Sequence, residues 1–100
     1  MAASYDKAFE NVIRLRVMSI LMVNESYDFN SFKELMDVTD GNLATHLRKL
    51  EEKGFINVKK SFIGRKPQTS YRVSKEGKKA FEAHLNFLEQ VINENKNNSK

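Results

Sequence analysis

The stretch TDGNLATHLRKLEEKG, residues 39–54, constrains the chain more than any other because both ends of a helix can be read in it. Thr39 is a good N-cap, since its hydroxyl can accept a hydrogen bond from a backbone N–H group of the first turn. Val38 before the cap and Leu43 inside the helix form a candidate hydrophobic staple. Gly54 suits the left-handed residue with which many helices end. We therefore predict a helix of about four turns here.

The two faces of this helix differ in character. Leu43, Leu47 and Leu50 recur at spacings of four and three, so they form one apolar stripe. Asn and Thr side chains can bond to base edges, and Arg and Lys can bond to phosphates or guanine. The opposite face begins with small or short polar residues and has two cations near its end. Its residues are Gly41, Asn42, Thr45, Arg48, Lys49 and Glu52. This pattern indicates a recognition helix over 39–53 that lies in a major groove; the alternative is an ordinary solvated surface helix.

The charge of the chain is concentrated in its middle third. The net charge is +4, but residues 41–73 hold eight Lys/Arg and two Asp/Glu, whereas residues 1–40 hold four Lys/Arg and seven Asp/Glu. A charge that served only solubility would be spread more evenly. The asymmetry therefore implies a polyanionic partner for the recognition helix and the segment after it.

A helix without Gly or Pro is predicted over residues 9–23, and residues 1–8 are expected to be frayed or lightly docked. One apolar stripe contains Phe9, Val12, Ile13, Val17, Ile20 and Leu21; a second contains Leu15, Met18 and Met22. A helix that is apolar on two sides is usually buried on two sides. The second stripe is covered either by another subunit or by the C-terminal helix of the same chain.

A helix-turn-helix is predicted from the elements that follow. Tyr27 and Phe29 alternate around a polar residue, as in a short strand. Ser31 with Glu34 forms a candidate capping box. Apolar residues at helical spacing then predict a short amphipathic helix: Phe32, Leu35 and Met36. Only a few residues separate this helix from the recognition helix, as in helix-turn-helix motifs.

After Gly54 the apolar period changes from that of a helix to two, which predicts a β-hairpin with strands over 55–62 and 69–73. The connection 63–68 contains Gly and Pro, the usual residues of turns. The hairpin carries four cations that are candidate DNA contacts: Lys59, Lys60, Arg65 and Lys66. Lysines often protect a strand edge from aggregation, which accounts for the first pair. It does not account for the two cations at the tip.

A long C-terminal helix is predicted from Ser74, its cap, to about residue 94, within one domain over 1–94. The distal half of this helix overhangs so small a body and needs an apolar partner. We expect a homodimer interface built from both ends of the chain: Leu15, Met18, Met22, Phe87, Leu88, Val91 and Ile92. Residues 95–100 form a polar tail that we expect to be disordered.

The composition argues against an enzyme. The chain has no cysteine and two histidines, and we find no carboxylate cluster, phosphate-binding loop or activated nucleophile. We therefore expect no metal and no cofactor. We expect a structural role for His46, such as a hydrogen bond to a neighbouring element. His84 lies beside the apolar stripe of the last helix, where the alternative is a pH-sensitive dimer contact. No membrane-spanning run or signal pattern is found, so the cytoplasm is the default location.

At the residue level the chain resembles the MarR-like bacterial and archaeal regulators, and within them a small winged-helix subgroup. The resemblance rests on RLRVMSILMVNESYDFNSFKEL, TDGNLATHLRKLEEKGFI and KKSFIGRKPQTSYRVSKEGKKAF, which lie between about residues 9 and 85. It implies a mainly α fold with a small β-hairpin, a winged helix-turn-helix of the α+β class. It also implies a dimeric transcription regulator. Matching groove-facing positions are Gly41, Asn42, Thr45, Arg48 and Lys49, and Arg65 and Lys66 match the wing tip.

The sequence thus predicts a homodimeric regulator that reads double-stranded DNA at an inverted-repeat operator. The larger MarR-type proteins carry extra terminal helices that build the dimer and often a ligand pocket. This chain has one terminal helix at each end for that role, and the sequence does not tell whether it binds a small-molecule effector. One alternative is a winged-helix module that docks proteins, which would be expected to show large apolar anchors on the exposed helix face. Another is non-specific architectural DNA binding, which needs the cations but not Asn42 and Thr45.

Overall fold

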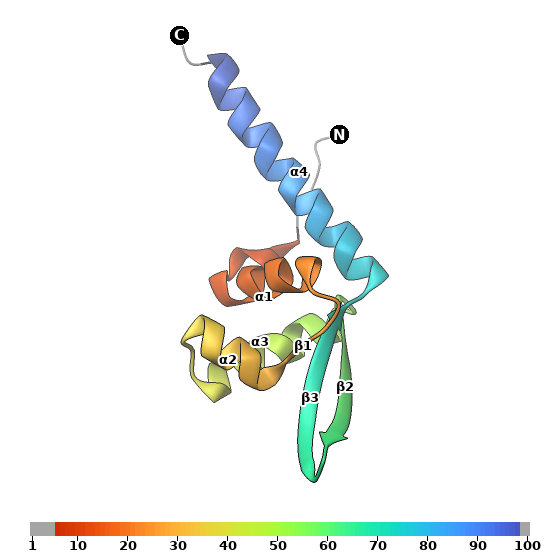
Figure 1. The fold of residues 1–100 in the computed structure, drawn as a ribbon. Coiled ribbons are helices and arrows are strands. Elements are labelled where there is room, and N and C mark those ends of the chain that lie inside the picture. The colour runs from red at the N-terminus through yellow and green to blue at the C-terminus, as the bar shows by residue number, and fades with distance from the viewer. Residues whose placement is uncertain (1–5, 99–100) are drawn as a thin grey trace.

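In Figure 1 a β-hairpin projects from one end of a cluster of three helices, and a long helix leaves from the other end. This computed structural model describes residues 6–98, and its principal extents are 61 × 26 × 21 Å. The elements, in chain order, are η1 (Lys7–Glu10), α1 (Val12–Val23), β1 (Tyr27–Asp28), α2 (Phe29–Met36), α3 (Asp40–Glu52), β2 (Ile56–Ile63), β3 (Lys66–Val73) and α4 (Lys75–Asn98). The predicted mainly α fold with a small hairpin is confirmed.

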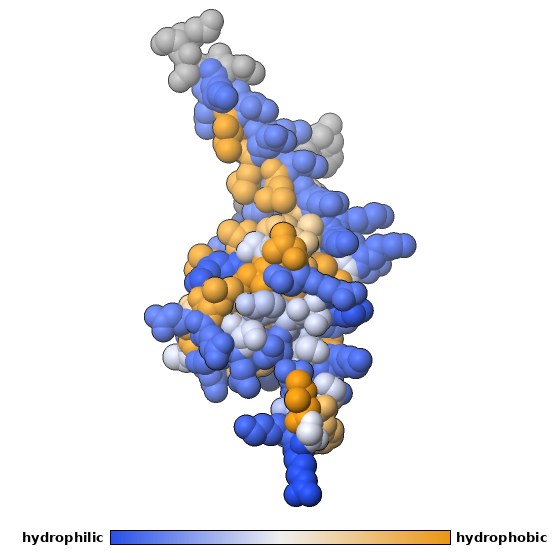
Figure 2. Space-filling view, viewed as in Figure 1, coloured by the Kyte–Doolittle hydropathy of each residue, from blue (hydrophilic) through white to orange (hydrophobic). Residues whose placement is uncertain are grey.

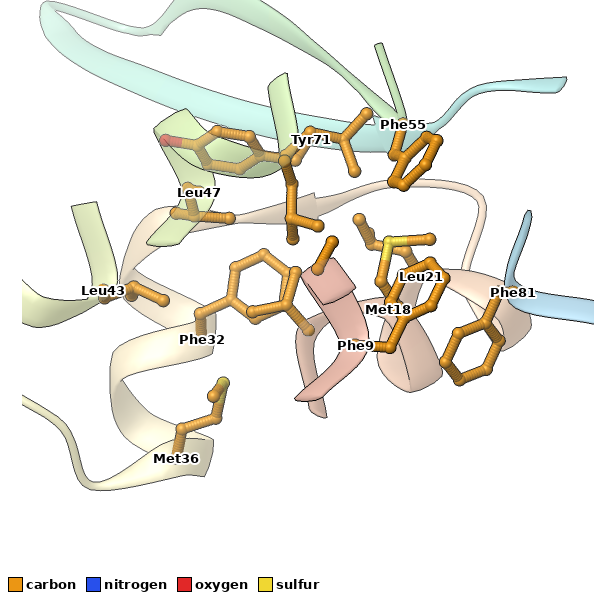
Figure 3. Close-up of a cluster of buried hydrophobic side chains, with 14 residues drawn as sticks. Phe9, Met18, Leu21, Phe32, Met36, Leu43, Leu47, Phe55, Tyr71 and Phe81 are labelled. Carbon is orange, nitrogen blue, oxygen red and sulfur yellow. The ribbon is translucent and has the colours of Figure 1, made fainter. Parts of the chain in front are cut away.

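The core lies where α3 packs on α1, α2 and the base of the hairpin. Leu43, Leu47 and Leu50 are all buried, so the predicted facing of α3 is confirmed. Figure 3 shows that η1, the four α-helices and β3 all contribute side chains to this cluster. Its largest fully buried members are Phe32, Met18, Leu21, Leu43, Leu50, Ile56 and Val17.

The first helix begins later than predicted. Asn11 has extended backbone angles, and its side chain accepts hydrogen bonds from two N–H groups of the first turn of α1. This cap breaks the expected helix over 9–23, so Phe9 lies in the separate 3₁₀ turn η1 instead. The break also turns Val12 outward, where its side chain is 64% exposed; its predicted place in the core stripe was wrong.

Phe9 joins the N-terminus to both the hairpin and α4. Its ring stacks on that of Phe55 with centroids 5.5 Å apart and meets that of Phe81 edge-on at 5.4 Å. Asp6 nearby forms an ion pair of 2.7 Å with Lys53 at the end of α3. Residues 6–8 are therefore docked rather than frayed, and residues 1–5 lie outside the described residues.

Helix α2 is capped by Asp28, not by the predicted box of Ser31 and Glu34. The Asp28 carboxylate accepts from the Ser31 N–H at 3.1 Å and from the Ser31 hydroxyl at 2.7 Å. The hydroxyl bond is the main reason that the pKa of Asp28 lies below its ordinary value. The cap ends β1 one residue earlier than predicted, and on α2 itself Leu35 is exposed while the other two predicted core residues are buried.

The turn between α2 and α3 is fixed by backbone conformation and by one lysine. Asp37 adopts the left-handed region at φ 52° and ends α2. Lys33 donates to the carbonyl of Val38 and forms an ion pair of 2.8 Å with Asp40, the first residue of α3. These contacts hold the start of α3 against the end of α2.

Both predicted ends of α3 are confirmed. The Thr39 hydroxyl accepts from the Asn42 N–H at 3.1 Å. At the other end, Gly54 has φ 78°, and the Phe55 N–H donates to the Leu50 carbonyl at 3.0 Å. With the bond of 2.9 Å from the Gly54 N–H to the carbonyl of Glu51, this is a Schellman motif.

The hairpin is longer and its turn tighter than predicted. The strands are antiparallel in the order β1-β3-β2, and they pair out to Ile63 with Lys66. Only Gly64 and Arg65 connect them. Gly64 has φ 62° and Arg65 does not have a positive φ, the pattern of a type II′ turn. The expected connection 63–68 is therefore mostly strand. We call the β2–β3 hairpin the wing.

Helix α4 starts at a close junction with the end of α3. The Ser74 hydroxyl donates to the Gly54 carbonyl at 2.6 Å and accepts from the Gly77 N–H at 2.9 Å, so Ser74 caps α4 as predicted. Gly77 touches the backbone of Phe55 so closely that a Cβ there would lie 2.1 Å from the carbonyl oxygen. At its far end α4 continues through Asn98, so residues 95–98 of the expected disordered tail are helical.

We predict that Gly77→Ala destabilises the fold by about 1–3 kcal/mol or more, because the added methyl group must displace backbone rather than a flexible side chain. Gly41→Ala is the matched control, since nothing lies within 4 Å of its added Cβ. That variant should be neutral or stabilising by about 0.5–1 kcal/mol. Urea unfolding of both variants is the measurement, and equal stabilities would contradict the described junction.

Candidate nucleic-acid interface

One face of α3 is free of the body. Its rotation is set by the buried leucines, and every position predicted to face a groove is exposed: Gly41, Asn42, Thr45, Arg48 and Lys49. The face begins with side chains short enough for a close approach to a surface. It ends with two cations placed to reach phosphates or guanine edges. The structure therefore brings together the five predicted residues of α3.

A guanidinium beneath α3 holds this helix to the N-terminus. The Arg14 Nε donates to the Ala8 carbonyl at 2.7 Å, and its Nη1 lies 2.8 Å from the Nδ1 of His46. Nδ1 must act as the acceptor, because a guanidinium only donates. Burial, and then the charges of Arg14 and Lys49, hold the pKa of His46 below its ordinary value. The expected structural role of His46 is confirmed, whereas its partner Arg14 was not predicted.

The wing brings more cations to the same side as α3. Alternation along β2 puts Lys60 on the face of Val58, toward the body, and Lys59 on the other face. A groove of about 370 Å³ separates α3 from the wing, and Arg48 and Lys60 line it from the two elements. Arg65 is exposed in the turn and Lys66 beside it. Lys59 faces away from this groove, and so does Lys66, because its register partner Ile63 lies on the same face of β2 as Lys59.

Two further cations lie near this surface. Lys7 of η1 and Lys53 after α3 share a surface hollow with Lys49 and Arg14. Lys53 could have been found from its place one turn beyond Lys49. Lys7 could not, because its position depends on the break at Asn11.

The residues predicted for a dimer interface lie on α1 and on the distal half of α4, and the two sets differ in exposure. Met18 is fully buried inside the chain, so its predicted place at a subunit interface was wrong; it packs in the core beside Leu21. Leu15 and Met22 are partly buried against the core. On the distal half of α4 Phe87 is half-buried, whereas several large apolar side chains are exposed: Leu85, Leu88, Val91 and Ile92. Figure 2 shows an apolar stripe along this part of α4.

His84 does not lie on the exposed side of α4. It is buried, and its ring is 5.3 Å from the ring of Phe9 and 6.3 Å from that of Phe81. This placement does not support the alternative of a pH-sensitive contact between subunits.

Within residues 6–98 no three His, Cys, Asp or Glu side chains are grouped so that they could hold a metal ion. In the same residues no helix is both long and apolar enough to cross a membrane. The polar face of α3 and the wing remain as the candidate site.

Comparison with known proteins identifies the family of this fold. A family model described as a winged helix DNA-binding domain matches residues 13–92. A protein of Methanocaldococcus jannaschii, named only as uncharacterized, is 37% identical over 91 residues, which are 91% of this chain and 96% of that protein.

Two solved structures show the same fold. A transcriptional regulator homologue from Pyrococcus horikoshii OT3 matches with a TM-score of 0.79 at 29% identity, over 88% of this chain and 87% of that one. A structure assigned to the MarR family of transcriptional regulators, from Enterococcus faecalis V583, matches with a TM-score of 0.78 at 16% identity, over 93% and 84%. The expected likeness to MarR-type winged helices is confirmed for the fold.

We predict that acid destabilises the chain through His46. Because its folded-state pKa lies below the ordinary value of 6.5, the unfolded chain binds this proton more readily than the folded one. The free energy of unfolding should therefore fall as the pH drops below 6.5, until the pH passes beneath the folded-state pKa. Protonation also removes the acceptor that faces Arg14.

The test is denaturant unfolding between about pH 8 and pH 5. His46→Gln offers Arg14 an acceptor that does not titrate, so its stability should change less over this range than that of the wild type. Equally steep profiles for the two chains would contradict the assigned role.

Proposed function

Since the chain belongs to the winged helix DNA-binding domain family, we propose that it is a cytoplasmic transcriptional regulator that binds double-stranded DNA sequence-selectively as a homodimer. The observation that carries the proposal is the exposed polar face of α3, held in a fixed orientation by buried leucines beside a cationic wing. The proposed role is binding and includes no catalytic step. The similar structure from Pyrococcus horikoshii, described as a transcriptional regulator homologue, supports this proposal.

In this proposal α3 lies in the major groove. Gly41 lets the backbone approach closely, while Asn42 and Thr45 reach base edges. Arg48 and Lys49 follow one turn later, where they reach guanine or the phosphates. A surface for docking a protein would be expected to present aromatic or large aliphatic anchors; the exposed α3 positions Gly41, Asn42, Thr45, Arg48 and Lys49 include none. Sequence is thus read mainly by α3.

The wing holds the duplex beside that groove. Arg65 and Lys66 project at the tip, and Lys60 lies across the groove from Arg48. Contacts to phosphate and to the minor groove suit these side chains, because they carry charge without much base selectivity. Lys59 faces away from the groove and is proposed to contribute charge to the approach of the duplex rather than a contact across it.

The distal half of α4 is proposed to form the homodimer. At 24 residues this helix is about 36 Å long, and its outer part carries exposed Leu88, Val91 and Ile92. Exposed apolar stripes of this kind usually mark an interface. A two-fold dimer pairs the same surface of each chain, with Leu15, Met22 and Phe87 at its edge. It also presents two α3 helices to successive grooves about 34 Å apart, so the operator should be an inverted repeat.

We predict that reading and holding can be separated by mutation. Duplexes selected from random sequence by the wild type should show a defined inverted repeat. On these, Asn42→Ala should cost about 1–3 kcal/mol and relax the base preference at one position of each half-site. Arg65→Ala should weaken binding to all sequences alike and reduce the slope of log affinity against log salt by roughly one unit per lost phosphate contact. Selection that enriches no sequence would argue for architectural binding.

We predict that Leu88→Glu disrupts the dimer without unfolding the chain, because the charge lies on the exposed stripe and not in the core. In sedimentation at matched concentration the wild type should behave as a dimer of 11.6 kDa chains and the variant as a monomer. The variant should also bind the full operator much more weakly. Asn86→Glu is the control, since it adds the same charge about half a turn away from the stripe. A wild type that sediments as a monomer at tens of micromolar would overturn the dimer.

A further inference from the structure

The face of the wing that packs on the body continues past it. Along β2 the residues of this face are Ile56, Val58, Lys60 and Phe62, which change from buried, through half-buried, to exposed. On β3 the residues directly opposite are Val73, Tyr71, Thr69 and Pro67. We call this the inner face of the wing. The outer half of this inner face and the exposed side of α3 lie on opposite sides of the groove between them.

An aromatic ring stands at the end of the inner face. Phe62 is 71% exposed, and its register partner is Pro67. It lies four residues beyond Val58, which is about 13 Å further along the strand. Figure 2 shows an apolar patch on the projecting wing, directly before its hydrophilic tip. The body of the chain does not cover this ring, whereas the other phenylalanines among the described residues are buried or partly buried.

The charge around the ring indicates what covers it. Lys60 precedes Phe62 on the same face, and Arg65 follows in the turn, whereas Lys66 begins β3 opposite Ile63, on the other face of the wing. An apolar ring that lies between Lys60 and Arg65 is suited to a surface that is both anionic and partly apolar. The minor groove has these properties, because phosphates rim it and sugars and base edges line it. A lipid surface or an apolar protein patch would not require that the ring share a face with the groove beside α3.

We propose that Phe62 is a minor-groove wedge: its ring presses between base pairs at a step beside each half-site and bends the duplex. This inference rests on the proposed function, since it needs the wing to lie on DNA. Proteins that insert such side chains partly unstack a step and kink the duplex by about 20–90°. Pyrimidine–purine steps yield most easily. Phe62 therefore selects a deformable step beside the half-site without a hydrogen bond to any base.

Ile63 is a built-in control for this inference. It is the next residue, it is 62% exposed, and it lies on the opposite face of the same strand, paired with Lys66. Removing either side chain takes an apolar group of similar exposure from the tip. Only Phe62 faces the space where the duplex would lie. If the tip acts only through general apolar contact, removing either side chain should weaken binding. If Phe62 acts as a specific contact, only its removal should do so.

The experiment compares wild type, Phe62→Ala, Ile63→Ala and Arg65→Ala on a duplex selected by the wild type, with 2-aminopurine placed in turn at each step flanking a half-site. The wild type should raise the 2-aminopurine fluorescence at one step and shorten the end-to-end distance measured by energy transfer. Phe62→Ala should lose both signals and bind about tenfold more weakly, equivalent to ~1.4 kcal/mol. Its salt slope should stay unchanged, unlike that of Arg65→Ala.

The outcomes separate the two proposals. If the wild type binds the duplex and Phe62→Ala matches both wild type and Ile63→Ala in bend and fluorescence, the wedge is overturned while DNA binding stands. Equal losses in Phe62→Ala and Ile63→Ala would also overturn it, because they would mean that the tip acts only through general apolar contact. If the wild type binds no duplex, the proposed function fails and the wedge fails with it.

Discussion

The burial of three leucines on α3 is the constraint on which the rest of the structure depends. Leu43, Leu47 and Leu50 are each at most 2% exposed. Burial of such side chains contributes about 1.5–3 kcal/mol each, so a rotation of α3 that lifted them out would cost a large share of a stability of about 5–15 kcal/mol. The same stripe that stabilises the fold thereby decides which residues α3 turns outward. In the proposed function, the surface that reads DNA is therefore set by the packing of the core.

A single junction links that helix to the other two functional parts. The Gly54 carbonyl accepts from the Ser74 hydroxyl, and the Phe55 backbone lies against Gly77. The wing therefore starts and ends at the point where α4 begins, so the wing and the proposed dimer helix are both positioned from the end of α3. Phe9 strengthens this junction from the N-terminal side through its contacts with Phe55 and Phe81. Such a connection suits the proposed dimer, which would present two recognition helices at a fixed spacing.

The parts of the fold that follow from local rules could be predicted from the sequence, and the parts that depend on competing local rules could not. Both caps of α3 and the cap of α4 followed from Thr39, Gly54 and Ser74. The break before α1 did not, because residues 9–23 contain no Gly or Pro and their apolar residues keep helical spacing across Asn11, so the capping role of its side chain could not be seen. Met18 was assigned to an interface because periodicity shows that a face is apolar but not what covers it. Exposure of the α3 face was predictable, whereas the bond between Arg14 and His46 joins residues too far apart in sequence for any pattern to reveal.

The central claim is that the outward face of α3 is the surface that meets DNA. Amide chemical shifts of the labelled chain, recorded while a duplex selected by the wild type is added, test it most directly. The account predicts that the largest changes fall on Asn42, Thr45, Arg48 and Lys49 and on the tip of the wing. Amides of the distal half of α4, away from the duplex, should change little. Chemical-shift changes concentrated on α4, with the α3 shifts unchanged, would contradict the account, because the polar face of α3 would then be only a solvated surface.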